Sequence, residues 1–335
     1  MGINKDGVII DHFDGKHAIA NKTIKTVGNP HDRFEEDKVR MIRAGRFAGR
    51  MNFEIDPETK EAIKKNAHKV KDVAPERIRD ELLKMAKESG DKFADTLLHL
   101  DEIGILEIIL PEITKLKEFK ETPHHHPEAY AFGDGTVYDH VLQALRANKV
   151  KDPLVNLAIL LHDVGKGSTY KNRDGKHTFY GHDMAAVELI ETIAKRLKLT
   201  NDEKDAVLFA AINHMKLFKS GGMKPTKIVK IVHDKNWELL KAVSLADDSA
   251  RLGLFDKKRF EETINSMEDI AKQWGGGTLG KVTKIVDGKR VMELTGLKPG
   301  KMIGDIISKV TEYVMDHGAK EDIDQLIMKA WKELK

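Results

Sequence analysis

The sequence has 335 residues, of which 40% are hydrophobic and 33% charged, and its formal net charge is +3. This length and composition favour a folded chain with a sizeable core, and the small net charge does not by itself indicate nucleic-acid binding. The absence of cysteine excludes disulfides, thiolate metal sites and cysteine nucleophiles. No apolar run is long enough to span a bilayer and no signal-peptide pattern is present, so we expect a cytoplasmic protein that does not associate with membranes.

The first elements in chain order are predicted to be short strands. Residues 7–11, "GVIID", and 23–28, "TIKTVG", are rich in β-branched residues and bounded by Gly and Asp, which predicts two strands around a turn. A helical period follows, in which Asp32 and Glu35 form a capping-box pattern before apolar residues at helical spacing. Two further capped helices are predicted over residues 56–67 and 74–89.

Residues 120–135, "KETPHHHPEAYAFGDG", are rich in Pro, Gly and His and are predicted to be a linker. For its run His124, His125 and His126 a solvated loop is favoured over a metal site, although the run directly precedes the next group of helices. Amphipathic helices are predicted from there to about residue 255, and a helical tail runs to the end. Because almost nothing after residue 30 resembles a strand, the sequence predicts a mainly α fold.

The glycine-rich segment 275–282, "GGGTLGKV", is similar to a phosphate-binding loop. Val282 stands where that loop has the Ser or Thr that binds Mg²⁺, and a helix rather than a strand is predicted before it. A linker is therefore favoured over a nucleotide site.

The strongest candidates for a functional site are His162 and Asp163, at the end of the apolar segment "LVNLAILL". A buried helix there carries both side chains into an interior site. A lone "HD" pair occurs often by chance. Other candidate residues, however, lie on successive predicted helices, each about one helical hairpin from the next, and successive helices can point such residues into one bundle centre. These further candidates are His140, His182, His214 and Asp247.

Imidazole and carboxylate groups together suit a divalent Ni, Mn, Mg, Fe or Zn ion. Such an ion lowers the pKa of bound water and neutralises charge on a phosphoryl oxygen. We expect four residues to hold it, and three alternatives remain for His182 and His214: a second metal site bridged by Asp163, contact with a substrate phosphate, or a role as acid. The four expected ligands are His140, His162, Asp163 and Asp247.

Residues 137–250 resemble an HD-superfamily phosphohydrolase domain, through the leading His140, the doublet and the distal Asp247. "LLHDVGKG…YGHD" is particularly similar to the HD domain of some bacterial CCA-adding tRNA nucleotidyltransferases, which is a metal-dependent phosphatase and 2′,3′-cyclic phosphodiesterase. The resemblance makes Lys166 of "HDVGK" a phosphate contact. That family often has "HHGH" where this chain reads "TFYGH", so only His182 is carried over.

The resemblance to the class II, bacterial-type CCA-adding tRNA nucleotidyltransferase/poly(A) polymerase family covers nearly the whole sequence. The family's "EDxxR" motif selects the incoming CTP or ATP, and "EDKVR" at 36–40 implies that Asp37 and Arg40 bind nucleotide. The spacing places these two residues one helical turn apart on one face, and the alternative is an exposed ion pair. The tail "VMELTGLKPGKMIGDII" resembles the family's tRNA-contacting tail. The expected RNA-binding residues are Arg43, Arg46, Arg77, Lys298 and Lys301.

In this family nucleotidyl transfer needs a Gly-rich turn and paired Asp residues in a catalytic head, and neither occurs here. "DHFD" at 11–14 has the wrong spacing and no preceding glycine loop. The resemblance implies a chain lacking most of the head, arranged as an elongated multi-helix assembly. Its expected parts are a β remnant of the head over 1–28, an RNA- and nucleotide-binding neck and body over 29–119, an HD phosphohydrolase domain over 120–255 and a helical tail over 256–335.

The function expected from these observations is a metal-dependent phosphohydrolase that acts on 2′,3′-cyclic or 2′-phosphates at RNA ends or on small nucleotides. Its catalytic residues are expected to be Asp163, Lys166, His182 and His214, and nucleotidyl transfer is not expected from this chain alone. The alternative, compatible with the first, is a tRNA-binding, nucleotide-selecting subunit of a split CCA-adding enzyme whose head is a separate chain. The complete ligand set argues against a purely structural remnant.

Overall fold

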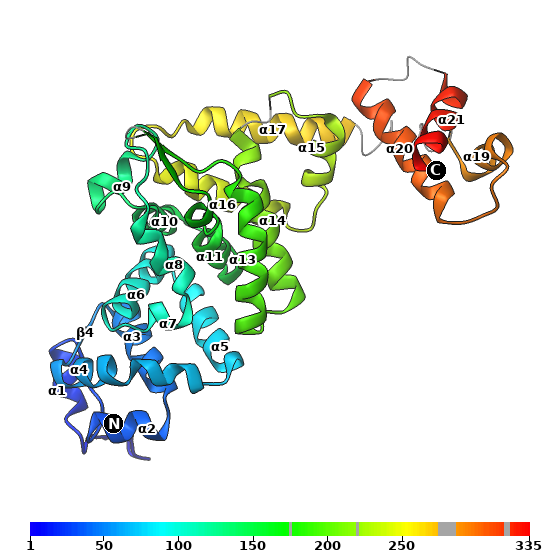
Figure 1. Ribbon diagram of the computed structural model, residues 1–335. Coiled ribbons are helices and arrows are strands. Elements are labelled where there is room, and N and C mark those ends of the chain that lie inside the picture. Colours follow the sequence, from blue (N-terminus) through cyan, green and yellow to red (C-terminus); the bar gives the residue numbers. More distant parts are fainter. Residues whose placement is uncertain (174–175, 219–220, 274–285, 318–321) are drawn as a thin grey trace. The chain divides into compact units, whose positions relative to one another are not determined.

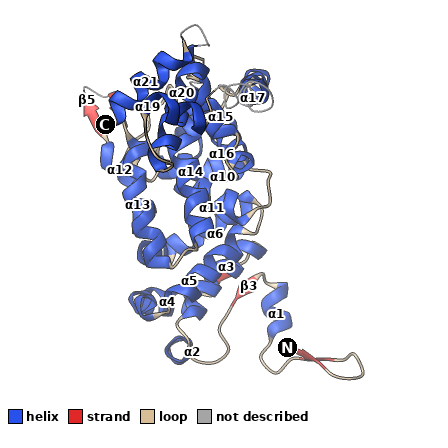
Figure 2. Cartoon of the chain, turned by 90° about the vertical axis from the view of Figure 1, so that its right-hand side faces the viewer, coloured by secondary structure: helices blue, strands red, loops and turns tan. Residues whose placement is uncertain are grey.

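The computed structural model describes residues 1–173, 176–218, 221–273, 286–317 and 322–335. These residues form helices joined by short loops, with only short strands among them (Figures 1 and 2). The predicted mainly α fold with a short β segment near the N-terminus is therefore confirmed. None of the described helices is both long and apolar enough to cross a membrane.

The chain divides into two compact units. The first contains residues 1–214 and 238–255, and the second contains residues 215–237 and 256–335. Each unit has its own apolar core. The P-loop-like segment 275–282 lies outside the described residues.

The N-terminal strands of the first unit form two separate pairs. β1 (Gly2–Ile3) runs antiparallel to β2 (Ile9–Ile10), whereas β3 (Thr23–Ile24) runs parallel to β4 (Glu54–Ile55). The predicted strands on either side of a turn do not pair with each other, because helix α1 (Gly15–Ala20) lies between them.

Nine short helical segments follow β3, and their starts depend on local capping. Asn29 caps the first of them by accepting a hydrogen bond from the His31 N–H at 2.9 Å, and Pro30 occupies the first helical position. The capping box predicted at Asp32 and Glu35 is therefore wrong, because those residues already lie inside the helix. The segments are α2 (Pro30–Glu36), α3 (Val39–Met51), α4 (Pro57–Asn66), η1 (Ala67–Asp72), α5 (Pro75–Ala86), α6 (Gly90–Glu102), α7 (Leu106–Ile109), α8 (Pro111–Thr114) and η2 (Lys115–Glu118).

The remaining helices of the first unit form the bundle that carries the candidate site (Figures 1 and 2). At its centre lies α11, whose residues 155–161 are all buried, as expected for a helix that is apolar on every side. The elements are α9 (Pro127–Phe132), α10 (Val137–Ala147), α11 (Pro153–Leu161), α12 (Lys166–Thr169), β5 (Lys171–Arg173), β6 (Lys176–Thr178), α13 (His182–Leu197), α14 (Asn201–Phe218) and α16 (Trp237–Ala250).

The segment 120–135, predicted to be a linker, packs against this bundle. Residues 127–132 form helix α9, and Glu121 and Glu128 are 2% and 0% exposed. The linker prediction is wrong here because two of the segment's acidic side chains find buried cationic and imidazole partners.

The second unit has a smaller core built from its C-terminal helices. Val291, Ile306, Val310 and Ile327 are almost fully buried in it. Its elements are α15 (Pro225–Val232), α17 (Lys257–Gln273), α19 (Gly288–Thr295), α20 (Lys301–His317) and α21 (Ile323–Leu334).

Candidate metal centre

Five segments of the bundle bring the predicted ligands into one buried cluster. α10 carries His140, α14 carries His214 and α16 carries Asp247, while His162 and Asp163 directly follow α11. These five residues are at most 6% exposed. His182, the first residue of α13, also reaches the cluster.

Two histidines face the distal aspartate and one oxygen of Asp163. His140 Nε2 lies 3.0 Å from Asp247 Oδ1 and 3.6 Å from Asp163 Oδ2. His162 Nε2 lies 3.1 Å from Asp163 Oδ2 and 3.9 Å from Asp247 Oδ1. The four residues predicted to hold one ion therefore converge.

The other two histidines face the second oxygen of Asp163. His182 Nε2 lies 3.5 Å and His214 Nε2 lies 3.7 Å from Asp163 Oδ1. Asp163 thus separates two groups of imidazoles, as a bridging carboxylate would.

The orientation of three of these rings is fixed by the backbone. The Nδ1 atoms of His162, His182 and His214 lie 2.6, 2.9 and 2.9 Å from the carbonyl oxygen three residues earlier. A carbonyl oxygen only accepts, so each of these Nδ1 atoms carries a proton and each ring directs its Nε2 atom to the centre.

Several polar atoms at the centre are buried without a hydrogen-bond partner: Nε2 of His140, His162 and His182, and Oδ1 of Asp163. Burial of such atoms without a partner is unfavourable by about 1–3 kcal/mol each. Imidazole nitrogen and carboxylate oxygen are the ligands that divalent transition metals prefer when cysteine is absent. The residues present therefore fit a divalent ion.

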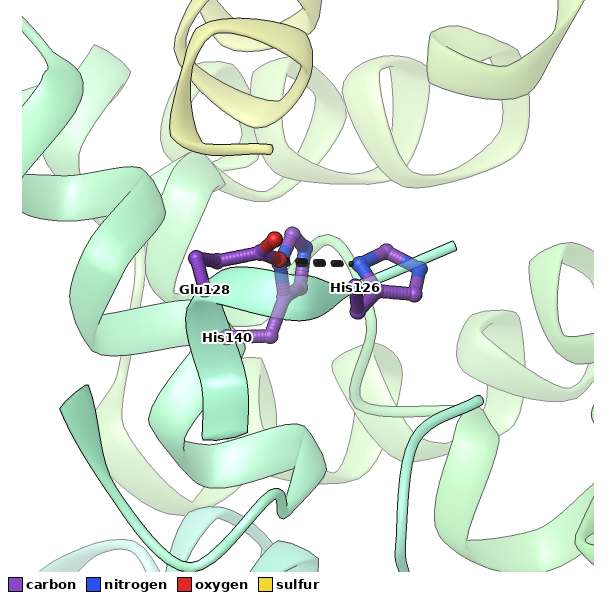
Figure 3. Close-up of side chains that lie close together, drawn as sticks. All are labelled: His126, Glu128 and His140. Carbon is purple, nitrogen blue, oxygen red and sulfur yellow. Dashed lines mark hydrogen bonds and ion pairs between the residues drawn. The ribbon is translucent and has the colours of Figure 1, made fainter. Parts of the chain in front are cut away.

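His140 is oriented by a carboxylate that the sequence did not reveal. Figure 3 shows the Glu128 side chain beside the ring of His140, and a dashed line runs from this pair to His126. Glu128 Oε1 lies 2.8 Å from His140 Nδ1 and 3.1 Å from His126 Nδ1. His126, predicted to be solvated together with His124 and His125, is only 17% exposed, whereas the other two are exposed.

Lys166 is buried between two carboxylates. Its Nζ lies 2.7 Å from Asp163 Oδ2 and 2.6 Å from Glu121 Oε1. Burial disfavours the ammonium, but the charges of Asp163 and Glu121 hold the pKa of Lys166 above its ordinary value. Contact between Lys166 and a phosphate stays a prediction.

The histidines differ in protonation because their neighbours differ. Burial alone would lower the pKa of His140, but the carboxylates of Asp247 and Glu128 beside it raise it to about 10. Burial and the adjacent charge of His162 lower the pKa of His214 to about 4. His214 is therefore neutral at pH 7, the form that binds a metal, whereas His140 releases a proton when it binds one.

The glycine of "HDVGK" permits close packing at the site. A Cβ on Gly165 would overlap the carbonyl oxygen of His182 and come within 2.6 Å of the Ala186 nitrogen. The absence of a side chain therefore lets the start of α13 approach the residues after Asp163 and brings His182 into the cluster.

The nucleotide-binding pair expected on a single helix lies instead at a junction between two helices. Asp37 has extended backbone angles and ends α2, and it accepts a hydrogen bond from the Val39 N–H at 3.2 Å, whereas Arg40 lies in α3. Asp37 Oδ2 lies 2.9 Å from Arg77 Nη2, and Arg40 Nη1 lies 2.7 Å from Glu36 Oε2. The placement on one helix is wrong because the extended backbone of Asp37 ends α2 before α3 begins, and nucleotide binding stays a prediction.

The residues expected to bind RNA lie in different environments. Arg43 and Arg46 both form ion pairs with Glu81, at 3.2 and 2.7 Å, and Glu81 is 2% exposed. Lys298 and Lys301 are exposed in the second unit. RNA contact by these residues and by Arg77 stays a prediction.

Comparison with known proteins places these features in a family. Residues 52–117 match a family described as "Probable RNA and SrmB- binding site of polymerase A", and residues 136–237 match the HD domain family. A "Multifunctional CCA protein" of Cupriavidus metallidurans is 30% identical over 290 residues, covering 83% of this chain and 67% of that protein. The chain belongs to the CCA-adding tRNA nucleotidyltransferase family with an HD domain.

Other relatives agree with this assignment of a tRNA nucleotidyltransferase-like protein. An "A-adding tRNA nucleotidyltransferase" of Deinococcus radiodurans is 28% identical over 320 residues, covering 91% of this chain and 70% of that protein. The fold is similar to that of the Bacillus stearothermophilus CCA-adding enzyme solved in complex with CTP. The TM-score is 0.62 at 20% identity, over 99% of this chain and 71% of that one.

The match to the HD family does not include every residue of the cluster in this tRNA nucleotidyltransferase-like chain. It contains the four histidines and Asp163, but it ends before Asp247 and begins after Glu121 and Glu128. The geometry therefore extends the candidate centre beyond the matched range on both sides.

Proposed function

We propose that this tRNA nucleotidyltransferase-like chain is a metal-dependent phosphohydrolase that acts on a phosphomonoester or a cyclic phosphodiester, at an RNA end or on a small nucleotide. The observation that carries the proposal is the buried convergence of His140, His162, Asp163 and Asp247 with unpartnered ligand atoms.

These four residues would hold a divalent Ni, Mn, Mg, Fe or Zn ion, and the Nε2 atoms of His182 and His214 offer further ligands beside Asp163 Oδ1. A bound ion in such a site lowers the pKa of water to near neutrality and stabilises negative charge on a phosphoryl oxygen.

The protein's own groups complete the chemistry. The Lys166 ammonium, 2.7 Å from Asp163, adds positive charge beside the developing phosphoryl charge. His182 is the most exposed of the four histidines of the cluster, at 12% against 0–1% for the other three. We assign it to proton donation to the leaving oxygen, with His214 as a neutral ligand.

The test is hydrolysis of bis-p-nitrophenyl phosphate and of 2′,3′-cAMP with Ni²⁺ or Mn²⁺, together with the metal content of the purified protein. Asp163→Ala should lower kcat by about 100-fold or more because both groups of imidazoles lose their shared carboxylate. Asp205→Ala, an exposed aspartate on α14, is the control and should retain activity. Absence of turnover with every divalent metal, or full activity of Asp163→Ala, would refute the proposal.

The N-terminal strands support a second function, compatible with the first. β1, β2 and the residues after them expose Ile3, Val8, Ile9 and Phe13, which are between 47% and 74% exposed. An exposed apolar ribbon fits a surface that another folded chain covers. This supports a tRNA-binding, nucleotide-selecting subunit that works with a separate catalytic head.

This second proposal is tested by a gel-shift titration of tRNA at low salt and by purification of the protein with its bound partners. The relation to tRNA nucleotidyltransferases supports tRNA as the RNA that shifts. Failure to shift tRNA, together with a protein that purifies alone, would refute it.

A further inference from the structure

A small basic hairpin connects two segments of the candidate metal centre. β5 and β6 run antiparallel between Lys166 and His182, and β5 is visible in Figure 2. The strands are tied to the bundle by Tyr170, whose hydroxyl lies 2.8 Å from His177 Nδ1 and whose ring stacks on that histidine. Thr122 also donates a hydrogen bond to the His177 carbonyl oxygen at 3.0 Å.

The strand register places the positive charges of the hairpin on one face. Lys171 pairs with Thr178 and Arg173 pairs with Lys176, while the intervening pair contains His177. Because side chains of neighbouring pairs alternate between the two faces, His177 lies on the face that contacts Tyr170 and the three cations lie on the other. Lys171, Arg173 and Lys176 are exposed.

Two of the three cations lie directly opposite each other. Arg173 and Lys176 are like charges in directly opposite positions, which destabilises an antiparallel pair. Among the residues that the structure describes, none of the three cations forms an ion pair with a carboxylate. A phosphate-bearing chain laid along this face would remove the repulsion.

An exposed aromatic residue lies in the chain between β6 and His182. Tyr180 is 86% exposed and stands two residues before His182. The preceding residue is held at the site, because Phe179 packs against Tyr170 and the Phe179 carbonyl oxygen accepts a hydrogen bond from His182 Nδ1. Cations that follow a backbone and an aromatic ring on which a base stacks are the two elements of single-strand recognition.

We propose that the cationic face of β5 and β6, together with Tyr180, binds the single-stranded end of an RNA and presents its terminal phosphoester to the metal centre. Lys176 and His182 are six residue steps apart and therefore at most about 21 Å from each other, a distance that a few nucleotides can cover. The inference rests on the proposed phosphohydrolase function and specifies its substrate as an oligonucleotide rather than a mononucleotide.

The first experiment compares kcat/KM for 2′,3′-cAMP with kcat/KM for a short oligoribonucleotide that ends in a 2′,3′-cyclic phosphate. Arg173→Gln/Lys176→Gln and Tyr180→Ala should lower the ratio of oligonucleotide to mononucleotide turnover. The reduction for Tyr180→Ala should be roughly 5- to 150-fold, and Tyr180→Phe should restore the ratio because it keeps the stacking surface. The control Lys151→Gln/Lys195→Gln removes the same charge from exposed lysines elsewhere and should leave the ratio unchanged.

A second measurement does not depend on hydrolysis. Binding of a fluorescently labelled single-stranded oligoribonucleotide is followed by anisotropy at several salt concentrations. Loss of two phosphate contacts should reduce the slope of log K against log salt by about 1.4 in Arg173→Gln/Lys176→Gln, with no change in the control.

The outcomes separate this inference from the proposed function. If no protein hydrolyses any substrate, the phosphohydrolase proposal fails, while the anisotropy data still decide whether the hairpin binds RNA. Wild-type ratios and wild-type salt slopes in the hairpin variants would overturn the inference. Equal competition by duplex RNA would overturn the assignment to a single strand.

Discussion

The carboxylate behind His140 provides the sharpest test of the candidate centre. Glu128 and His140 are both 0% exposed, and Glu128 Oε1 lies 2.8 Å from His140 Nδ1. A carboxylate in this position fixes the ring and increases the basicity of its free nitrogen, which in this structure is the unpartnered Nε2. Replacement of Glu128 should therefore weaken metal binding without removal of any predicted ligand.

The magnitude follows from the type of hydrogen bond. A buried hydrogen bond to a charged group contributes about 1.5–3 kcal/mol, which corresponds to roughly a 10- to 100-fold change in affinity. Glu128→Gln keeps an oxygen that can accept from Nδ1 but loses the charge, so we expect about a 10-fold weaker Kd. Glu128→Ala leaves the buried Nδ1–H without this carboxylate partner, so we expect about a 100-fold weaker Kd.

The assay is a competitive titration of Ni²⁺ or Mn²⁺ against a chromogenic chelator, with thermal unfolding measured on the same samples. Glu112→Gln is the control, because Glu112 forms a two-contact ion pair with Arg196 at 2.7 Å, apart from the histidine cluster. Unchanged metal affinity in both Glu128 variants would refute the reasoning, and so would an equal loss of affinity in Glu112→Gln.

Two further predictions concern packing and charge. Gly165→Ala should lower the free energy of unfolding by about 2–4 kcal/mol and weaken metal binding, because the new Cβ overlaps the His182 backbone. The control Gly304→Ala has open space around its Cβ and should be neutral or stabilising. Chemical denaturation of both variants measures the difference. Burial alone would raise the pKa of Glu81, but Lys84, Arg46 and Arg43 lower it below its ordinary value of 4.5. The ionised Glu81 therefore stabilises the fold above about pH 4.5, and this stabilisation is lost as the pH falls through the lower pKa that Glu81 has in the folded state. The difference in unfolding free energy between the wild type and Glu81→Gln, about 1.5–3 kcal/mol at pH 7, should therefore shrink as the pH falls from 6 toward 3. A difference independent of pH would contradict this explanation.

The set of candidate ligands could be predicted from the sequence because each residue lies on or beside a helix with a clear apolar period. The order His140, His162 and Asp163, then Asp247, follows the helices of the bundle, and antiparallel neighbours bring such residues to one end or centre. The Gly165 and Lys166 positions that follow the doublet also lie at the cluster, as a tight turn after the buried α11 requires.

The second layer of the site could not be predicted in the same way. Glu121, His126 and Glu128 belong to a segment whose Pro, Gly and His content is typical of an exposed loop, and only tertiary packing buries them. An acidic residue near the histidines of a metal motif is the signal that could have suggested Glu128, because ligating histidines commonly donate to carboxylates.

Helix boundaries and short strands were also missed for local reasons. α2 begins at Pro30 with Asn29 as its cap, and the Asp37 side chain accepts a hydrogen bond from the Val39 N–H at the junction between α2 and α3. β5 and β6 contain three residues each with no apolar alternation, so the period that identifies longer strands is absent.

The distribution of the candidate ligands over α10, the end of α11, α13, α14 and α16 has a consequence for folding. The unfolded chain does not hold these groups together, so an ion bound at the centre acts as a cross-link that forms only in the native bundle. A free ion at a hundred times its Kd adds about 2.7 kcal/mol to the stability of the folded state by mass action. In a chain without cysteine, the supply of metal would therefore affect the stability of this bundle as well as its chemistry.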